Sequence, residues 1–329
     1  MKIGIPRGLA IYEYQTLFIE FFKNLNIEVV MSDKTNREIL KDGINNSLQE
    51  SCLASKIFMG HVANLVKRQY KEKIDYIFIP RICSFENSQT ICVKFYAIYD
   101  ICKNVFDANF VTVNVDYNKN KTELKSFISL GRKLNKSVAN SIRAYILAKK
   151  SEEKYNNNRY IEQTSLIKLK TDKLKVLIVS HPYVLYDEIL GKRIINILKK
   201  QNIEIFLANI NSFNMINPKI FKRIRIRINN IGDKNYEQIS NTIFWKSSKN
   251  LLNGISTNLE NIDGIIYLSV FPCGTDSLVN ELAMRKNTDI PSLNLLLDEQ
   301  DSDVGIHTRI ESFLDILSMN KNNNIKLSG

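Results

Sequence analysis

The sequence predicts an α/β protein of two similar domains, each a doubly wound parallel sheet of the flavodoxin or Rossmann type, with a helical connection between them. Three observations support this fold class. Short β-branched runs alternate with helical periods, the first half of the chain is echoed by the second, and hydrophobic residues make up 44% of the 329 residues. A chain of this length and composition can bury its cores without disulfides or metal ions.

The first half opens with an apolar stretch over 2–5, which we expect to be a strand. An amphipathic run over 12–25 follows and predicts a helix, and the β-branched run at 26–30 predicts a second strand. Two further apolar runs, at 75–80 and 110–115, are typical of buried strands. The order is strand, helix, strand, with further strands after helical stretches.

The second half repeats this order. An expected strand at 175–179 precedes a helical run at 187–200 and a strand at 202–206. Further apolar runs at 263–268 and 292–297 correspond to the third and fourth strands of the first half. Such repetition predicts two domains built on one plan.

The predicted organisation has four parts. We expect an N-terminal α/β domain at 1–120, a helical and charged connection at 121–174, a C-terminal α/β domain at 175–318 and a disordered tail at 319–329. The polar segment 151–158 is the expected hinge.

Charge and hydropathy narrow the classes of partner. The net charge of +12 would suit phosphate-bearing partners, but the richness in Lys, Asn and Ile explains it as compositional bias, so we expect no nucleic-acid partner. The alternating basic and apolar residues at 222–228 predict an exposed edge strand rather than a phosphate clamp. With no membrane-length apolar run and no signal peptide, the expected location is cytoplasmic, without a membrane partner.

Five cysteines stand at positions 52, 83, 92, 102 and 273. Their odd number and the absence of a secretion signal argue against a disulfide framework. The sequence has no CxxC pair, which removes the strongest local sign of zinc or thioredoxin-like chemistry. Any metal site must therefore be assembled from distant segments.

Three of these cysteines precede helical runs. Cys52 stands before the run at 57–66, Cys92 opens a second run, and Cys273 follows a buried strand and leads into a third. Backbone N–H groups and the dipole at a helix start stabilise thiolate, the form that binds metal. We therefore expect Cys52, Cys92 and Cys273 to converge on a cleft between the domains, where Gly274 would let the backbone approach a cluster closely.

The other two cysteines are weaker candidates. Cys102 lies within a helical run and is best interpreted as a buried apolar residue. Cys83 follows an expected strand, as Cys273 does, but has no neighbouring glycine. The sequence leaves its role open, and a simple buried thiol is also the alternative for the three cysteines at helix starts.

Six motifs in order resemble the 2-hydroxyacyl-CoA dehydratase D-component-like family, which includes double-cubane cluster proteins and acyl-CoA dehydratase activase-related proteins. The resemblance extends from Met1 to about Leu317 and includes Asp298-Glu299 and the Gly305 to Glu311 region. The motifs are Lys2-Ile3-Gly4-Ile5-Pro6-Arg7-Gly8, Glu50-x-Cys52-x-x-x-Lys56, Asp75-Tyr76-Ile77-Phe78-Ile79-Pro80-Arg81, Cys92-x-Lys94-Phe95, His181-Pro182-Tyr183 and Phe271-x-Cys273-Gly274-x-Asp276-Ser277.

The resemblance implies an iron–sulfur cluster, either [4Fe–4S] or a double-cubane derivative, held by Cys52, Cys92 and Cys273. It further implies that a separate ATP-dependent activase delivers low-potential electrons to this cluster. These electrons would support reductive or dehydratase chemistry on an acyl-CoA or related small molecule. Whether the protein acts as a homodimer or with a homologous second subunit stays open.

The chain departs from the family pattern beside each proposed ligand. Ala54, Val93 and Thr275 stand where the family commonly has proline, which puts cluster type and substrate in doubt more than the cluster itself. The sequence also contains no P-loop, so ATP hydrolysis would have to come from another protein.

Further candidates surround these cysteines. His181 ends the first strand of the second half, where it could donate a proton, ligate a metal or simply order the loop. Glu299 could supply acid–base chemistry. Lys56, one helical turn after Cys52, could offset the charge of a cluster or be a solvated lysine, and Gly274 is assigned with it to cofactor binding.

Three function classes follow from these residues. The first is a cluster-dependent reductase or a lyase resembling (R)-2-hydroxyacyl-CoA dehydratase. The second is a non-catalytic electron-transfer or partner subunit, and the third is a cluster-free α/β binding module. Cluster content and turnover on CoA esters separate the three.

Overall fold

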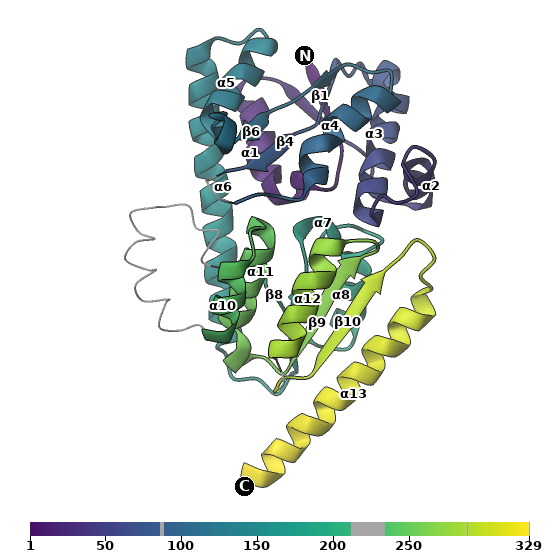
Figure 1. The fold of residues 1–329 in the computed structure, drawn as a ribbon, viewed down its shortest axis with the longest axis vertical. Coiled ribbons are helices and arrows are strands. Elements are labelled where there is room, and N and C mark those ends of the chain that lie inside the picture. The colour runs from purple at the N-terminus through teal and green to yellow at the C-terminus, as the bar shows by residue number, and fades with distance from the viewer. Residues whose placement is uncertain (86–88, 212–233, 288, 329) are drawn as a thin grey trace. The chain divides into compact units, whose positions relative to one another are not determined.

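The computed structural model describes residues 1–85, 89–211, 234–287 and 289–328. The chain divides into two compact units, each with its own parallel sheet. Unit 1 comprises residues 1–155, 186–189 and 244–246, and unit 2 comprises residues 156–185, 190–243 and 247–329. The proposed edge strand at 222–228 lies outside the described residues. The predicted fold class, two doubly wound α/β halves, is confirmed (Figure 1).

The main sheet of unit 1 has four parallel strands in the order β2-β1-β3-β5. The first strand of the chain is thus flanked by the second and the third, which is the arrangement of flavodoxin-like folds. The bounds are Lys2–Ile5 for β1, Glu28–Met31 for β2, Tyr76–Phe78 for β3 and Phe110–Val111 for β5.

Helices cover both faces of this sheet. A Cβ on Gly4 would lie 3.3 Å from Leu65 of α3, so α3 covers the face that Gly4 shares with its neighbour Ile77. Phe78 points the other way and packs against Phe18 of α1, with ring centroids 5.0 Å apart. The helices of this half are α1 (Ala10–Asn24), α2 (Arg37–Asn45), α3 (Leu53–Glu72), α4 (Val93–Val105), η1 (Tyr117–Lys119), α5 (Glu123–Lys133) and α6 (Val138–Ile167).

The third and fourth strands of unit 1 are each broken into two. Beyond the main sheet, β4 (Arg81–Ser84) pairs with β6 (Asn114–Asp116) as a separate two-stranded sheet. The break falls at Pro80, which has no N–H to donate to a neighbouring strand. One consequence corrects our reading of Cys83, because this residue lies within β4 and not in a loop after the strand.

Unit 2 repeats the strand order of unit 1. Its strands run β8-β7-β9-β10, so each strand occupies the place of its counterpart in the first half. All pairings are parallel. The bounds are Lys175–Val179 for β7, Glu204–Leu207 for β8, Gly264–Val270 for β9 and Ser292–Leu297 for β10.

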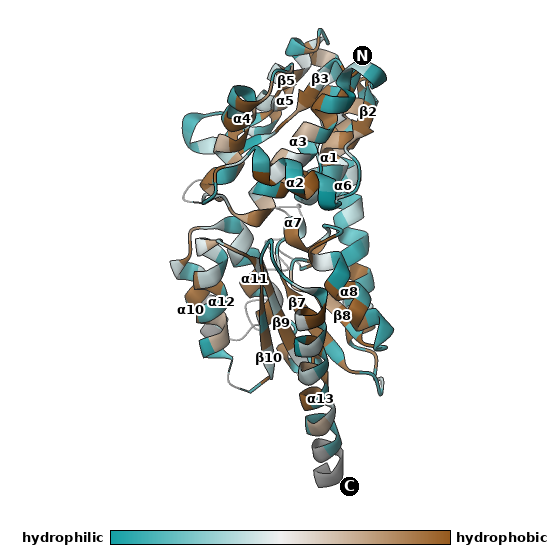
Figure 2. Cartoon of the chain, turned by 90° about the vertical axis from the view of Figure 1, so that its right-hand side faces the viewer, coloured by the Kyte–Doolittle hydropathy of each residue, from teal (hydrophilic) through white to brown (hydrophobic). Residues whose placement is uncertain are grey.

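The sheet of unit 2 is also covered on both faces. A Cβ on Gly264 would lie 2.7 Å from Leu317, which places α13 against that face. Tyr267 has the opposite parity along β9, and burial, with a smaller contribution from Tyr236 of α10, raises the pKa of its hydroxyl. Figure 2 shows the strands as mainly hydrophobic and the helices as mixed. The helices are α7 (Pro182–Leu185), α8 (Gly191–Lys200), α10 (Lys234–Thr242), α11 (Lys246–Ser256), η3 (Leu259–Asn261), α12 (Gly274–Lys286) and α13 (Asp303–Ser328).

Two short segments from the second half of the chain complete unit 1. In the segment 186–189, Asp187 is fully buried and accepts a hydrogen bond from Thr35. In the segment 244–246, Phe244 accepts from the Thr90 N–H at 3.1 Å and Lys246 donates back to the Thr90 carbonyl at 3.1 Å. Unit 1 is therefore not a continuous stretch of chain.

The residues after Met319 differ from the expected tail. They belong to α13, which continues to Ser328. Within this part of α13, the Lys321 ammonium donates to the Lys173 carbonyl at 2.8 Å and lies 3.5 Å from Asp263. The division between the units falls at 155/156, within α6 and within the polar segment 151–158.

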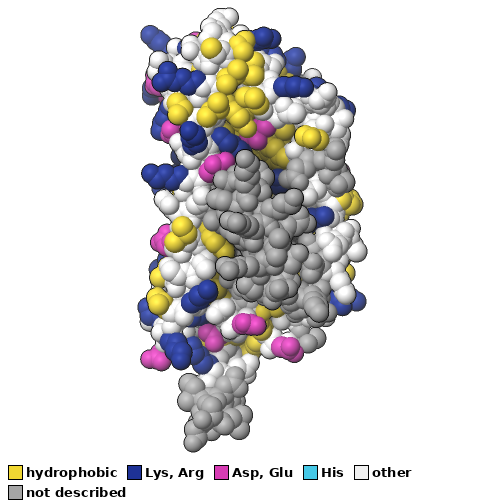
Figure 3. Space-filling view, turned by 90° about the vertical axis from the view of Figure 1, so that its left-hand side faces the viewer, with side chains coloured by type: hydrophobic (Ala, Val, Ile, Leu, Met, Phe, Trp, Pro, Cys, Tyr) yellow, Lys and Arg dark blue, Asp and Glu magenta, His cyan; other side chains and the backbone are white. Residues whose placement is uncertain are grey.

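Apolar side chains gather on the face of unit 1 drawn in Figure 3, with Lys and Arg around them. Exposed apolar residues of α5 and α6 include Leu124, at 38% exposure, and Ile146, at 45%. Among the described residues, no helix is both long enough and apolar enough to cross a membrane.

Candidate functional site

The three cysteines expected at helix starts all occupy that position. Cys52 is the N-cap of α3, Cys92 the N-cap of α4 and Cys273 the N-cap of α12. In each case the side chain makes no capping hydrogen bond to its own helix. Ser, Thr, Asp or Asn normally fills this position and satisfies an N–H of the first turn. Cysteine at three such positions gives up that stabilisation and presents sulfur there instead.

Two of these helix starts lie side by side within unit 1. The Lys94 ammonium, in the first turn of α4, donates to the Ser51 hydroxyl at 3.4 Å. Ser51 immediately precedes Cys52, and Lys94 follows Cys92 by two residues. Neither α3 nor α4 has an acidic residue in its first turn. The Lys94 contact therefore links the starts of two helices, each with cysteine at its N-cap, where the N–H groups of the first turn favour anions.

Lys56 is not a solvated lysine. It lies on α3 one turn after Cys52 and is only 5% exposed. Its backbone explains part of this burial, because a Cβ on Gly43 of α2 would lie 2.0 Å from the Lys56 carbonyl oxygen. The close approach of α2 therefore covers this turn of α3.

In unit 2 the candidate residues follow neighbouring strands at one edge of the sheet. His181 follows β7, Cys273 follows β9 after a short loop, and Glu299 follows β10. Because β9 lies between β7 and β10, Cys273 is the central one of the three. The carboxyl ends of parallel strands are the usual place for ligands in such sheets.

His181 has a buried carboxylate partner that the sequence analysis did not assign. Its Nε2 lies 2.8 Å from Asp276 Oδ1, and the two residues are 4% and 5% exposed. Asp276 belongs to the first turn of α12, where a carboxylate interacts favourably with the helix dipole. The His181 ring also stacks on Tyr183, with ring centroids 5.1 Å apart. The sequence did contain a clue to Asp276 as a residue of this site, because it stands only three residues after Cys273.

Cys273 and Glu299 each have a polar neighbour close to them in the sequence. Cys273 Sγ lies 3.3 Å from the Thr275 hydroxyl, a contact that the family's proline would not supply. A Cβ on Gly274 would meet no heavy atom within 4 Å, so packing does not require glycine there. Glu299 is half-buried in the turn after β10, where its N–H donates to Asp298 at 2.5 Å.

The remaining cysteines have ordinary surroundings. Cys102 is fully buried 3.5 Å from Met59 Sδ, and burial raises the pKa of its thiol. This confirms the interpretation of Cys102 as a buried apolar residue. Burial, with a smaller contribution from the Asp116 carboxylate, also raises the pKa of Cys83. A raised pKa disfavours the thiolate that binds metal.

Cys52 and Cys92 belong to unit 1, whereas Cys273 belongs to unit 2. Across the described residues, no three or more His, Cys, Asp or Glu side chains are grouped as a metal site. The donor chemistry nevertheless fits a cluster, since soft thiolates select iron–sulfur clusters or zinc and Gly274 leaves room beside one of them.

The fold and these helix starts define a class: a two-unit parallel α/β protein with cysteine at the starts of three helices. The chain belongs to the family described as "CoA enzyme activase uncharacterised domain (DUF2229)", which matches residues 2–210. The matched region includes Cys52, Cys92 and His181 and ends before Cys273. This membership connects the chain with CoA-dependent enzyme systems and agrees with the activase-related part of the resemblance.

No curated protein matches the chain. Among solved structures, the chain is similar to the SBP FpvC from Pseudomonas aeruginosa in complex with Mn2+, with 11% identity and a TM-score of 0.29. That comparison covers 100% of this chain and 99% of the other. At this TM-score the similarity supports no conclusion about fold or function.

Proposed function

We propose that the protein is an iron–sulfur component of an acyl-CoA enzyme system, with Cys52, Cys92 and Cys273 as the cluster ligands. The observation that carries the proposal is the cysteine N-cap at α3, α4 and α12. Helix starts favour anions, and a thiolate-ligated cluster is an anion. When bound, the cluster would accept one low-potential electron at a time from a separate ATP-dependent activase.

The residues of this chain have distinct roles in the proposal. The three thiolates hold the cluster, and Gly274 leaves its first helical turn open to it. Asp276 orients His181, which is the candidate to move a proton during reductive or dehydratase chemistry on an acyl-CoA or related small molecule. Glu299 is a second proton-transfer candidate at the same sheet edge, and Lys56 supplies a buried positive charge one turn after Cys52.

Iron and acid-labile sulfide, measured per chain with an absorption spectrum on protein purified without oxygen, test the proposal. We expect about four of each and a broad visible band. Serine at Cys52, Cys92 or Cys273 should lose most of the iron. Alanine at Cys102, which is buried beside Met59, is the matched control and should keep it.

Equal iron loss from the Cys273 and Cys102 variants would contradict the ligand assignment. Wild-type protein that takes up no iron after anaerobic reconstitution would defeat the cluster itself, leaving an α/β binding module.

A second candidate is a non-catalytic partner subunit with the same cluster. The family description favours it, because the words refer to activation of a CoA enzyme. A stable complex with an activase or dehydratase subunit, without turnover of any CoA ester by this chain, would support the partner role. Turnover by the isolated, cluster-loaded chain would exclude it.

A further inference from the structure

We infer that one face of the α5–α6 pair in unit 1 is a docking surface for an acidic amphipathic helix of a partner protein. The surface has an apolar stripe at its centre and cations on both sides. The stripe residues are Leu124 and Ile128 of α5 and Ile142 and Ile146 of α6. The inference does not depend on the proposed cluster.

The packing of the two helices determines where the stripe lies. Three contacts join α5 to α6, and each step of four residues forward along α5 is a step of four back along α6. The contacts are Gly131 with Ser141, Phe127 with Tyr145 and Glu123 with Lys149. The helices are therefore antiparallel, and their register places Leu124 level with Ala148.

Each stripe residue directly follows one of these contact residues in the sequence. In an antiparallel pair, the next residue on each helix turns toward the same face, so the four side chains lie on one side of the contact. Burial agrees with this geometry. On the other side Leu130 and Ala144 are buried, whereas on this side Leu124 is 38% exposed and Ile146 is 45% exposed.

This part of the chain also concentrates positive charge. Residues 121–155 contain nine Lys and Arg and three Glu, so their net charge of +6 is half of the +12 of the whole chain. Two of the three carboxylates, Glu123 and Glu152, lie 3.0 and 2.8 Å from the half-buried Lys149. They are thus held by Lys149 and not by the cations of the surface.

Two exposed cations stand on opposite sides of the stripe. Lys125 follows Leu124 on α5 and Arg143 follows Ile142 on α6, so each lies one position further from the contact between the helices. Neither forms a salt bridge with any residue that the structure describes. Figure 3 shows apolar side chains gathered on unit 1 with Lys and Arg beside them. A partner with apolar residues between two rows of carboxylates would complement this arrangement.

The dimensions suit a helix. From Ile142 to the level of Leu124 the stripe covers six residue positions of α6, about 9 Å at the rise of an α-helix. Apolar residues at i, i+4 and i+7 of a partner helix span about 10 Å, which is the spacing used when an amphipathic helix docks through its apolar face.

Charge and burial disfavour other occupants. A second copy of this face would bring like charges together. The chain's own segment 212–233, which lies outside the described residues, has five Lys and Arg and one Asp, so it does not complement the surface either. Ile128 and Ile142 are half-buried between the helices and do not project as a membrane-inserting side chain would. Nucleic acid would leave the apolar stripe without a partner.

Fluorescence anisotropy of a labelled peptide, titrated with the full chain, tests the inference. The probe is a designed helical peptide with Leu at i, i+4 and i+7 and Glu on both sides of that row. A second peptide, with Lys in place of each Glu, is its control. We expect the chain to bind the Glu peptide, and Ile146→Asp and Arg143→Glu each to weaken binding roughly tenfold.

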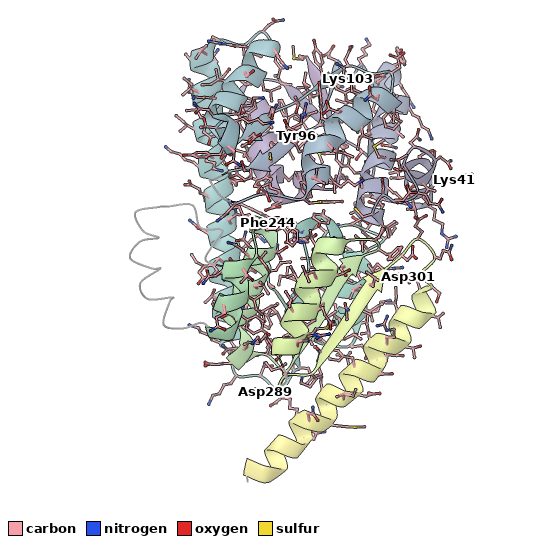
Figure 4. All side chains as sticks on the ribbon, viewed as in Figure 1. Lys41, Tyr96, Lys103, Phe244, Asp289 and Asp301 are labelled. Atoms are coloured by element: carbon pink, nitrogen blue, oxygen red, sulfur yellow. The ribbon has the colours of Figure 1, made fainter. Side chains whose placement is uncertain are left out.

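Lys103→Glu is the matched control for charge reversal. Lys103 is an exposed residue in the last turn of α4, labelled in Figure 4, and lies on neither α5 nor α6. The variant should bind the Glu peptide as the wild type does. Because Ile146 is already 45% exposed, Ile146→Asp should keep the wild-type circular dichroism spectrum, which separates lost binding from lost fold.

Three outcomes would overturn the inference. The first is wild-type protein that binds neither peptide, or binds the Lys peptide as tightly as the Glu peptide. The second is equal weakening by Lys103→Glu, which would assign binding to net charge alone. The third is binding to phosphatidylglycerol vesicles in preference to the Glu peptide, lost in Ile146→Asp, which would make the stripe a lipid-contacting surface. None of these results alters the iron content on which the proposed function rests.

Discussion

The two units share a strand order but differ at the helix starts that carry cysteine. In unit 1, Cys52 and Cys92 begin two helices whose first turns lack acidic residues, with the Lys94 ammonium close to both segments. In unit 2, Cys273 begins a helix whose first turn holds Asp276, buried against His181. One sheet plan therefore supports two cysteine N-caps without an acidic first turn in one unit, and in the other a cysteine N-cap whose helix carries a histidine-paired carboxylate in its first turn.

The glycines differ in the same way. Gly60 of unit 1 is required by packing, since a Cβ there would lie 1.9 Å from the Ile39 carbonyl oxygen. Gly274 of unit 2 has no such neighbour. Identical residue types thus serve helix packing in one place and leave open space beside a cysteine in the other.

The largest effect is expected from Gly60→Ala. The new methyl group would overlap the backbone of α2, which cannot give way as a flexible side chain would, so unit 1 should lose about 4 kcal/mol of stability. Urea unfolding followed by tryptophan fluorescence measures it, because Trp245 is the only tryptophan in the sequence and belongs to unit 1. A variant as stable as the wild type would show that α2 does not pack on α3 this closely.

Gly254→Ala is the counterpart in unit 2. Its Cβ would lie 1.9 Å from the Ala208 carbonyl oxygen, so a similar loss should appear in far-ultraviolet circular dichroism and not in fluorescence. Loss in both signals would mean that the two units unfold together.

The second effect is a loss of stability in acid, which we expect because His61 is buried in its neutral form. Burial, with a smaller contribution from the Arg7 charge, lowers the pKa of His61 from 6.5 to about 3. The two ring nitrogens lie 3.0 Å from the Ser32 and Thr35 hydroxyls. The unfolded chain takes up a proton below pH 6.5 while the folded chain does not. Stability of unit 1 should therefore fall by roughly 1.4 kcal/mol per pH unit as pH drops from 6.5 toward 3.

His61→Gln should flatten this dependence, measured as the urea midpoint of Trp245 fluorescence between pH 7 and pH 4. His307→Gln is the control in unit 2, where the ring is 44% exposed beside Glu311. An unchanged slope in His61→Gln would assign the acid sensitivity to other groups.

Sequence patterns predicted most of the sheet architecture, because strand runs of period two and helical runs of period 3.6 are local signals. They also placed all three cysteines at helix starts. They missed the break at Pro80 and thus the position of Cys83 in β4. The apolar pattern of residues 75–80 would be the same whether or not the strand left its sheet at Pro80. The pattern therefore could not reveal the break.

Long-range contacts of the site had no comparable signal. Asp187 and Trp245 stand in the second half of the chain, yet their segments complete unit 1. The Lys94–Ser51 contact spans 43 residues and the His181–Asp276 contact spans 95, and no periodicity encodes either. Both Lys94 and Asp276 were visible in the quoted motifs, but their partners follow only from the packed units.

A moderate effect is expected in unit 2 from Asp276→Ala. The change leaves the His181 Nε2 without its buried carboxylate, which should cost about 2 kcal/mol. Circular dichroism should detect the loss while Trp245 fluorescence stays at the wild-type midpoint. Asp315→Ala, at an exposed position of α13, is the control and should change neither signal. A neutral Asp276→Ala would indicate that the pair contributes no net stability.

The smallest effect on stability, and the sharpest test of the comparison, is expected from Gly274→Ala. Its Cβ would enter open space, and alanine has the higher helix propensity, so stability should stay equal or rise by less than about 1 kcal/mol. If that space serves a cluster beside Cys273, the same methyl group should reduce the iron bound per chain after anaerobic reconstitution. Full iron content in a stable Gly274→Ala variant would separate this glycine from cluster binding. Iron loss without any loss of stability would mean that the fold of unit 2 leaves Gly274 open for a ligand, whereas in unit 1 Gly60 is needed by the fold itself.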